Sequence, residues 1–457
     1  MPINTSCLET NLQTQIDGFT CATAPEDLLF TANSAKNLTT DVESYVALGC
    51  ELPDLNEGKT PVGSMFYVDE LGVPVVAGSQ SWLGLDGRTY RKDIPDTELY
   101  SWGCNCSAVL SIGSISVIGF SSPVREFNSV TTWQSISAGV GHQHAVKIDG
   151  TLWGAGRNGF GNLGIGNTTS CYTSFVQEIS SSTNWSISNA DADQSHAIKT
   201  DGTLWGWGGN SYGVLGVGNA IAYSSPVQEI SSSSNWCAVS GTRNGTVALK
   251  TDSTLWGWGY DQYGHIGDCD STLKSSPVQE AYSETNWSKI AGGLEYTLAI
   301  KTSGELWATG NGSCGRLGYD CINTKYSFVQ EITSSSNWYS ISAGFCTSTG
   351  IKSDGTLWAW GANNFGQVGD SSLVNASSPV QEISSSTSWC SSSRDYNIAL
   401  AIKTDGTLWG WGCNLGGALG DGTNICASSP VQEITSSTNW SSSSNSYYAS
   451  HALKLVV

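Results

Sequence analysis

The sequence predicts an all-β fold class, a seven-bladed β-propeller closed by strands from both termini and preceded by a small α+β module. Three observations lead to this prediction. The composition, with 53 Gly and 19 Trp but only 13% charged residues, suits tight turns and strands filled by aromatic rings. A Leu-Trp pair recurs in steps of 51 or 52 residues, a period typical of propellers and arrays, with its leucine at Leu152, Leu204, Leu255, Leu306, Leu357 and Leu408. A second tryptophan series recurs at Trp133, Trp185, Trp236, Trp287, Trp338, Trp389 and Trp440.

Residues 1–95 contain no copy of the repeat, so we expect a separate docking or assembly module there. Proline at Pro25 followed by two acidic residues indicates the first turn of a helix, and a second short helix is expected over residues 41–48. Residues 64–69 and 73–77 are expected to form a hairpin that residues 82–87 extend as a further strand.

Residues 96–457 are expected to form the propeller, with four strands in each repeat. The strands are Trp-x-x-Ile-Ser, Ala-x-Lys, Leu-Trp-x-Trp-Gly and Ser-Pro-Val-Gln-Glu-Ile. Asp-Gly between the second and third strands is a strong hairpin signal, because a type I′ turn needs positive φ at both central positions. Each buried aromatic ring hides ~150–250 Å², so we expect the tryptophans to fill the core.

The two ends of the repeat array indicate how the ring closes. The last strand ends at Leu455 without the Asp-Gly turn that should follow, and the first blade begins at Thr97 with the strand that should come after that turn. One blade is therefore expected to take two strands from each terminus. Such a blade removes the open edges that invite aggregation.

Charge and hydropathy limit the classes of partner. Lys+Arg 20 against Asp+Glu 39 gives a net charge of −19, which would repel a phosphate backbone, so no nucleic-acid partner is expected. The sequence shows neither a signal-peptide pattern nor ~20 consecutive apolar residues, so no membrane span is expected.

The 14 cysteines are scattered through the chain, and no Cys/His spacing matches a zinc site. Equivalent positions on different blades are usually too far apart for the ~5.5 Å Cα spacing of a disulfide. The better local candidates are Cys314 with Cys321 and Cys7 with Cys21. The alternative is that these are small buried thiols, and the sequence leaves open whether any disulfide forms.

The repeated motif Asp-Gly-x-Leu-Trp-x-Trp-Gly-x-Asn-x-x-Gly-x-Leu-Gly, together with Gly-x-x-His and Ser-Pro-Val, resembles the repeats of the regulator of chromosome condensation family. The resemblance covers Thr97 to Val457 and implies a seven-bladed propeller that binds proteins. The founding member of the family is a nuclear exchange factor for a small GTPase that binds nucleosomes. Near-uniform repeats and the acidic charge argue against that role here. Bacterial relatives include a secreted inhibitor of β-lactamases, which implies pure binding on the same scaffold.

The N-terminal stretch Tyr67-Val-Asp-Glu-Leu-Gly-Val-Pro74, followed by Trp82-Leu-Gly-Leu-Asp-Gly-Arg88, resembles short modules of tailed-phage structural proteins. This resemblance implies a role in a virion, where residues 1–95 would contact other virion proteins.

Candidate binding residues lie where the repeats vary. Five positions beginning six residues after each tryptophan of the second series change from blade to blade, and they connect the same two strands, so they must emerge at one end of the propeller. Tyrosine, arginine and short polar residues are typical of adaptable binding surfaces. The alternative is that these are unselected solvated loops. The candidate binding residues are Asp191, Asp193, Arg243, Glu295, Tyr296, Phe345, Asp395, Tyr396, Tyr447 and Tyr448, joined by Arg394 one position before its loop.

The leading prediction is a non-enzymatic phage virion protein, in the tail, fibre or capsid surface, whose propeller loops meet a host surface protein or glycan. The alternative is a secreted or cytoplasmic protein-binding propeller, an inhibitor or adaptor. A third possibility is a carbohydrate-active enzyme using Asp191, Asp193, Glu295 or Asp395. We expect no catalytic residues, no metal and no cofactor in the leading case, and a homo-oligomer is compatible with it. Asp268-Cys-Asp270 lacks the further acidic residues that a calcium loop needs.

Overall fold

The computed structural model describes residues 96–456 except for residues 106 and 115–118 and the side chain of Asp395, and it describes the strand backbones of residues 65–90. The chain divides into two compact units, Met1–Ile94 and Pro95–Val457. In the first unit, the hairpin predicted over residues 64–77 and the third strand are present. They form an antiparallel sheet in the order β1-β2-β3-β4, made of β1 (Met65–Val68), β2 (Val73–Ala77), β3 (Trp82–Gly84) and β4 (Thr89–Tyr90). The two helices predicted over residues 24–48 lie outside the described residues.

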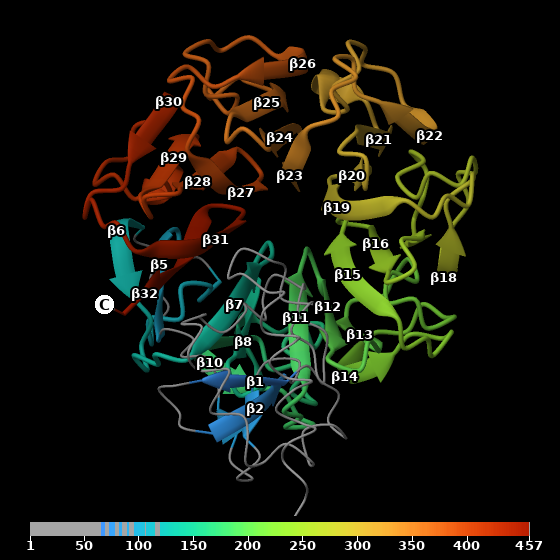
Figure 1. Cartoon of the computed structure of the whole chain (residues 1–457), viewed down its shortest axis with the longest axis vertical. Coiled ribbons are helices and arrows are strands. Elements are labelled where there is room, and N and C mark those ends of the chain that lie inside the picture. Colours follow the sequence, from blue (N-terminus) through green and yellow to red (C-terminus); the bar gives the residue numbers. More distant parts are fainter. Residues whose placement is uncertain are drawn as a thin grey trace, which may run out of the picture. The chain divides into compact units, whose positions relative to one another are not determined.

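The second unit is a ring of seven four-stranded antiparallel sheets around a central axis (Figure 1), as the repeat count predicts. Blade 1 contains β7 (Trp133–Ala138), β8 (His142–Lys147), β9 (Leu152–Arg157) and β10 (Cys171–Gln177). Blade 2 contains β11 (Trp185–Ala190), β12 (Gln194–Lys199), β13 (Leu204–Gly208) and β14 (Tyr223–Gln228). Blade 3 contains β15 (Trp236–Gly241), β16 (Gly245–Lys250), β17 (Leu255–Gly259) and β18 (Lys274–Gln279).

Blades 4 to 6 repeat this order, and two of them carry a short 3-10 turn after the third strand. Blade 4 contains β19 (Trp287–Gly293), β20 (Tyr296–Lys301), β21 (Leu306–Gly310), η5 (Ser313–Gly315) and β22 (Lys325–Gln330). Blade 5 contains β23 (Trp338–Ala343), β24 (Thr347–Lys352), β25 (Leu357–Gly361) and β26 (Ala376–Gln381). Blade 6 contains β27 (Trp389–Asp395), β28 (Ile398–Lys403), β29 (Leu408–Gly412), η6 (Leu415–Gly417) and β30 (Ala427–Gln432).

Blade 7 closes the ring with strands from both ends of the repeat array. Its order is β31-β32-β5-β6, made of β31 (Trp440–Ser446), β32 (Ala449–Leu455), β5 (Thr97–Gly103) and β6 (Phe120–Arg125). Strands β32 and β5 pair from Ala449 opposite Gly103 to Leu455 opposite Thr97, an unbroken register of seven pairs. The predicted closure is therefore confirmed.

The tryptophans divide into two classes of burial. Those that begin the innermost strands, and the second Trp of Leu-Trp-x-Trp, are at most 3% exposed. The first Trp of each Leu-Trp pair, such as Trp205, is only partly buried, which differs from the prediction that every tryptophan fills the core. The reason is a lysine: Lys199 Nζ lies 4.7 Å from the ring centroids of both Trp185 and Trp205, so the outer ring covers a cation that keeps contact with water.

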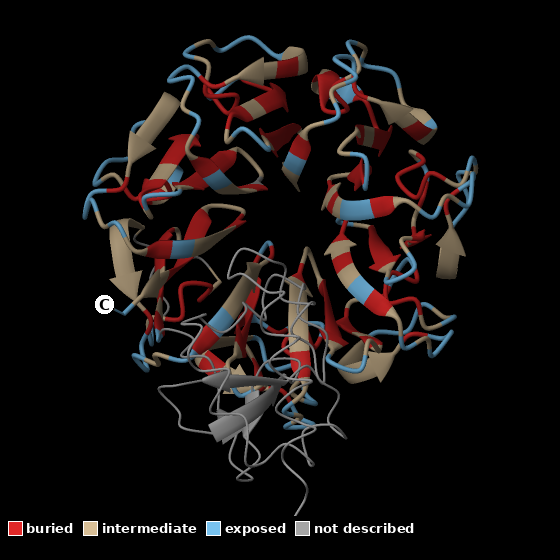
Figure 2. Cartoon of the chain, viewed as in Figure 1, coloured by how far each residue is buried: buried red, intermediate tan, exposed pale blue. Residues whose placement is uncertain are grey.

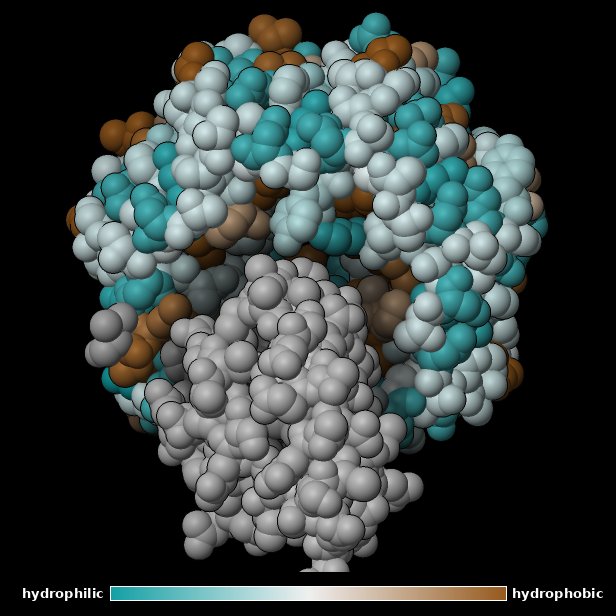
Figure 3. Space-filling model, viewed as in Figure 1, coloured by the Kyte–Doolittle hydropathy of each residue, from teal (hydrophilic) through white to brown (hydrophobic). Residues whose placement is uncertain are grey.

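Buried residues concentrate in the blade strands, and exposed residues lie mainly in the outer loops (Figure 2). Within the part of the chain that the structure describes, no helix is long and apolar enough to cross a membrane. On the face drawn in Figure 3, apolar side chains outside the grey region lie both near the outer edge and around the centre of the ring, and form no single patch. Cys314 and Cys321, a predicted disulfide pair, are both free thiols, while Cys104 is disulfide-bonded.

Candidate functional site

Hydrogen bonds join the innermost strands of neighbouring blades at four junctions around the central axis, from blade 7 through blades 1, 2 and 3 to blade 4. The residue four positions after the first tryptophan of a blade is polar in six blades, and at these four junctions its side-chain oxygen accepts a hydrogen bond from a backbone N–H of the next blade. Four such bonds are 2.9 Å long: Ala190 N to Ser137 Oγ, Gly241 N to Asn189 Oδ1, Gly292 N to Ser240 Oγ, and Ala138 N to Ser444 Oγ. These bonds satisfy backbone groups that inner strands at a sheet edge would otherwise leave unpaired. They also hold the inner strands in place as the wall of a central space.

That wall encloses a cavity of about 640 Å³ on the propeller axis. At the next position along each inner strand five blades carry Ala or Gly, which keeps the space open. The cavity is lined by both the inner strands and the loops that connect them to the second strands. Seven of the predicted binding residues line it: Asp191, Asp193, Arg243, Phe345, Arg394, Tyr396 and Tyr447.

One sector of the cavity is charged. The Asp191 carboxylate accepts hydrogen bonds from Arg243 N at 2.7 Å and Gln194 Nε2 at 2.9 Å, and burial raises the pKa of this carboxyl group to about 6. A Cβ on Gly241 would lie 2.4 Å from Asp191 Oδ2, so the absence of a side chain on the neighbouring inner strand makes room for this carboxylate. Asp193 forms a 3.1 Å ion pair with Arg157, and both side chains are nearly half exposed.

The opposite sector is aromatic and comes from blades 5 to 7. The ring centroids of Phe345 and Tyr396 are 4.5 Å apart, those of Tyr396 and Tyr447 are 4.2 Å apart, and those of Tyr447 and Tyr448 are 4.3 Å apart. A hydrogen bond with Tyr447 raises the pKa of Tyr396. All four rings are partly exposed. We call these four residues the aromatic row; it offers apolar faces together with hydroxyl donors, a combination suited to protein recognition.

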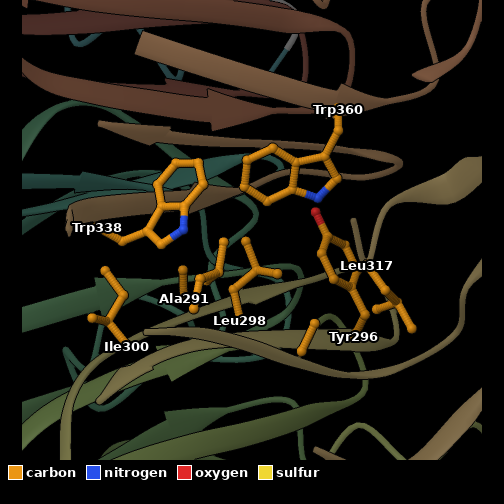
Figure 4. Close-up of a cluster of buried hydrophobic side chains, with 9 residues drawn as sticks. Ala291, Tyr296, Leu298, Ile300, Leu317, Trp338 and Trp360 are labelled. Carbon is orange, nitrogen blue, oxygen red and sulfur yellow. The ribbon is translucent and has the colours of Figure 1, made fainter. Parts of the chain in front are cut away.

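Two of the predicted binding residues, Tyr296 and Arg394, are buried. Tyr296 is fully buried in a hydrophobic cluster of blades 4 and 5 that includes Leu298 and Trp360 (Figure 4). Its hydroxyl donates to Thr347 O at 3.0 Å. This differs from the expectation of a surface residue, because Tyr296 is the first residue of strand β20, whose six residues are all buried. Burial raises the pKa of Tyr296 to about 12. Arg394 lines the wall but is only 7% exposed; its Nη2 donates to Gln367 O, and burial lowers its pKa to about 9.

Of the four acids named for a hydrolase, Asp191 and Asp193 line the cavity. Glu295 is not among the cavity-lining residues, and its carboxylate accepts a 3.1 Å hydrogen bond from Asn311. The side chain of Asp395 lies outside the described part of the structure. Asp268 and Asp270, the two acids considered for a calcium loop, both form ion pairs with the ammonium group of Lys274. In the residues that the structure describes, no group of three or more His, Cys, Asp or Glu is arranged to hold a metal ion.

Two kinds of site residue are not evident from the variable loops. Arg157 belongs to the end of strand β9 and reaches the cavity from a third strand, and the serines and asparagine that accept the hydrogen bonds between blades belong to the inner strands. The polar residue four positions after each tryptophan of the second series repeats in six of seven blades, so its periodicity is a signal that could have identified these hydrogen bonds.

Comparison of the sequence with known proteins finds relatives that carry similar repeats. A model described as "Regulator of chromosome condensation (RCC1) repeat" matches residues 201–249 and 354–399, and a second model of the same description matches residues 338–367. The ultraviolet-B receptor UVR8 of Arabidopsis thaliana is 29% identical over 303 residues, which are 64% of this chain and 67% of the receptor. The probable human E3 ubiquitin-protein ligase HERC3 is 28% identical over 188 residues, which are 40% of this chain but 18% of the ligase.

Solved structures of similar fold cover most of the chain. Prp20p from Saccharomyces cerevisiae has a TM-score of 0.71 at 15% identity and covers 80% of this chain and 92% of its own. Human WBSCR16 has a TM-score of 0.69 at 16% identity and covers 79% of this chain and 99% of its own. The family matches lie within residues 201–399, so the phage resemblance of residues 67–88 stays a prediction. The chain therefore carries repeats of the regulator of chromosome condensation type, folded as a seven-bladed propeller similar to UVR8 and Prp20p.

Proposed function

We propose that this chain is a protein-binding propeller of cellular type, and that its partner contacts the rim of the axial cavity through the aromatic row and the charged sector opposite. The observation that carries this proposal is the convergence of six variable-loop residues and the adjacent Arg394 on one cavity, while the framework residues stay nearly identical between blades. Variable residues on a rigid scaffold are the usual place for recognition.

The relatives support binding rather than catalysis. One relative, UVR8, is named as a receptor, and the yeast structure is described with binding to Gsp1p and histones. The ligase relatives match over small shares of their own length, 18% for human HERC3 and 6% for human HERC2, so their named activity does not transfer with the repeat.

The test replaces two rings of the aromatic row and compares partner capture. Tyr396→Ser with Tyr447→Ser should leave the fold intact, because both rings are partly exposed, and should reduce capture of the partner from source-cell extract by at least about tenfold, as expected for central aromatic contacts. The control is Tyr282→Ser with Tyr339→Ser, which removes two tyrosines that are 64% and 56% exposed and lie away from the cavity. Quantitative mass spectrometry of the captured proteins gives the measurement. If both double variants retain the same captured set as the unmodified chain, the rim is not the binding surface.

The narrower prediction of a phage virion protein rests on the N-terminal resemblance alone. The relatives named above come from plant, yeast and human, so we put the cellular binding propeller first. Localisation, in a virion, secreted or cytoplasmic, is likewise a proposal. Proteomics of purified particles from the source would find this chain in stoichiometric amount if the virion role holds, and its absence from particles would end that proposal.

A further inference from the structure

Two free thiols of neighbouring blades meet beside the aromatic row. Cys314 lies in the 3-10 turn η5 of blade 4, and Cys346 lies in the loop between β23 and β24 of blade 5. Both are free and half-buried, and the Cys314 thiol lies near enough to that of Cys346 to help raise its pKa. Cys346 directly follows Phe345, the ring at one end of the aromatic row. A bond at this place would therefore act on the proposed binding rim.

One guanidinium fixes the backbone next to both cysteines. Arg316 Nε donates to Ser313 O at 2.9 Å, and Arg316 Nη1 donates to Phe345 O at 3.0 Å. Ser313 precedes Cys314 and Phe345 precedes Cys346, so the same planar group holds the two segments at a set separation. Arg316 is only 4% exposed, and such a buried, fully engaged side chain has little freedom.

The other side of each segment is held as well. Cys346 O accepts a 2.9 Å hydrogen bond from Ala362 N, at the start of the loop after β25. Gly315 N donates to Gly312 O at 3.0 Å and closes the 3-10 turn around Cys314. These hydrogen bonds of Arg316, Ala362 and Gly315 thus hold the two cysteine segments beside each other without involving either thiol.

We propose that Cys314 and Cys346 form a disulfide between blades 4 and 5 when the protein meets a small-molecule disulfide such as oxidised glutathione, and that this bond restrains the Phe345 side of the binding rim. The chemistry is thiol–disulfide exchange. The Cys314 thiolate attacks one sulfur of the oxidant and releases the first reduced thiol; the Cys346 sulfur then attacks Cys314 and releases the second. Two protein thiols are oxidised by two electrons, the oxidant is reduced to two thiols, and the two protons pass to those products.

The order of attack follows from burial. Burial raises the pKa of the Cys346 thiol to about 11, so that group is seldom deprotonated at neutral pH and serves as the second, resolving sulfur. The rival for Cys314 is Cys321, seven residues away in the same loop, where hydrogen bonds, the first from the Asn323 backbone, lower the thiol pKa. A disulfide between Cys314 and Cys321 would close a loop within blade 4 and would not restrain Phe345 at the binding rim.

Peptide mapping of the full chain distinguishes these outcomes. After incubation with oxidised glutathione, alkylation and digestion without reduction, we expect a cross-linked peptide joining Cys314 and Cys346. It should form unchanged in Cys321→Ser and disappear in Cys346→Ser. A Cys314–Cys321 peptide, or glutathione adducts with no cross-link, would overturn the proposal.

A second measurement reads the restraint on the rim. Hydrogen exchange of residues 345–347 should slow on oxidation of the unmodified chain and stay the same in Cys346→Ser, and the oxidised chain should gain a few °C in Tm, since the bond closes a loop of 31 intervening residues. Unchanged exchange in an oxidised, cross-linked chain would disprove the effect on the rim. The consequence for recognition rests on the proposed function, but both readouts work without a partner, so failure of the cross-link and failure of partner binding are separate results.

Discussion

At the scale of single residues, buried polar groups contribute to the stability of the blades. The glutamate of each Ser-Pro-Val-Gln-Glu strand is at most 2% exposed, and it caps the turn that leads into the next blade. In blade 5, the Glu382 carboxylate accepts hydrogen bonds from Ser384 N at 2.7 Å, Ser386 N at 2.9 Å and Trp389 Nε1 at 3.1 Å. One acid thus ties the fourth strand of a blade to the first strand of the following one.

Replacing this carboxylate should destabilise the protein. Glu382→Gln keeps the shape but turns one acceptor oxygen into a donor facing an N–H, so we expect a loss of about 1–3 kcal/mol in the free energy of unfolding. The measurement is urea unfolding monitored by tryptophan fluorescence. Asp96→Asn, at an exposed position, makes the same chemical change and should alter the unfolding free energy by less than about 0.5 kcal/mol. Equal effects of the two substitutions would show that the buried hydrogen bonds contribute nothing.

Buried histidines make the fold sensitive to acid. Burial lowers the pKa of His144 and His196 to about 4 and that of His451 to about 3. As the pH falls below about 6.5, the unfolded chain takes up protons that the folded chain does not, so stability is present above pH 6.5 and is lost between pH 6.5 and about 4.

Substitution of one histidine tests this dependence. Leu298 and Leu400 occupy the same strand position in blades 4 and 6, so His196→Leu fits the blade. Val214 O loses one of three donors but keeps Trp258 Nε1 and Thr246 Oγ1. We expect the drop in unfolding free energy between pH 7 and pH 4.5 to shrink by roughly 2–3 kcal/mol, measured by urea unfolding at both values. An unchanged drop would mean that His196 is protonated in the folded state as readily as in the unfolded one.

At the scale of elements, blades lock together through the second tryptophan of Leu-Trp-x-Trp. Trp207 Nε1 donates to Asn162 O of blade 1 at 2.8 Å, and Trp411 Nε1 donates to Gln367 O of blade 5 at 2.8 Å. Blades 1 and 4 lack this tryptophan and carry Ala155 and Thr309 instead. In both blades the fourth strand exchanges its proline for a buried phenylalanine, Phe175 or Phe328, whose ring centroid lies 4.7 or 4.8 Å from that of the blade's first tryptophan.

The exchange predicts coupled substitutions in blade 4. Thr309→Trp alone should crowd Phe328, and Phe328→Pro alone should leave a void, so each should cost about 2–4 kcal/mol. The double variant restores the residue pair of blades 2, 3, 5, 6 and 7 and should cost less than either single change. A double-mutant cycle by urea unfolding measures this coupling, and additive losses would refute the compensation.

The blades also show how much of the fold and of the site could be predicted from the sequence. The blade count, the strand order and the closing blade follow from counting a period, because each repeat must form the same four strands. The sequence also showed which blades lack the second tryptophan, but not that Phe328 fills its place, since this depends on contacts between blades. The site was predicted in part for the same reason. The loops were correctly expected to share one end, yet Tyr296 turns into the core and Arg157 arrives from another strand, and neither direction can be read without the packed neighbours.

At the scale of the whole molecule, closure decides whether the ring is one cooperative unit. Every other blade is continuous in sequence, whereas blade 7 exists only when the two ends of the repeat array pair. Leu99 and Leu453, at most 1% exposed, pack with Trp133 of blade 1, so the closing pair also seals the neighbouring blade. Beyond the strand pairs, Val456 N donates to Asp96 O at 2.7 Å.

Removal of the last strand should therefore affect the entire propeller. Deleting residues 449–457 leaves β31 and β5 as two unpaired edges with exposed apolar side chains, and we expect loss of cooperative unfolding together with aggregation. Deleting only residues 456–457 keeps all seven β32–β5 pairs and should cost no more than about 1 kcal/mol. Calorimetry and light scattering of both truncated chains provide the comparison. If the longer deletion still gives a single sharp transition at the Tm of the full chain, six blades close without the seventh, and the pairing of the two termini is not what makes the ring cooperative.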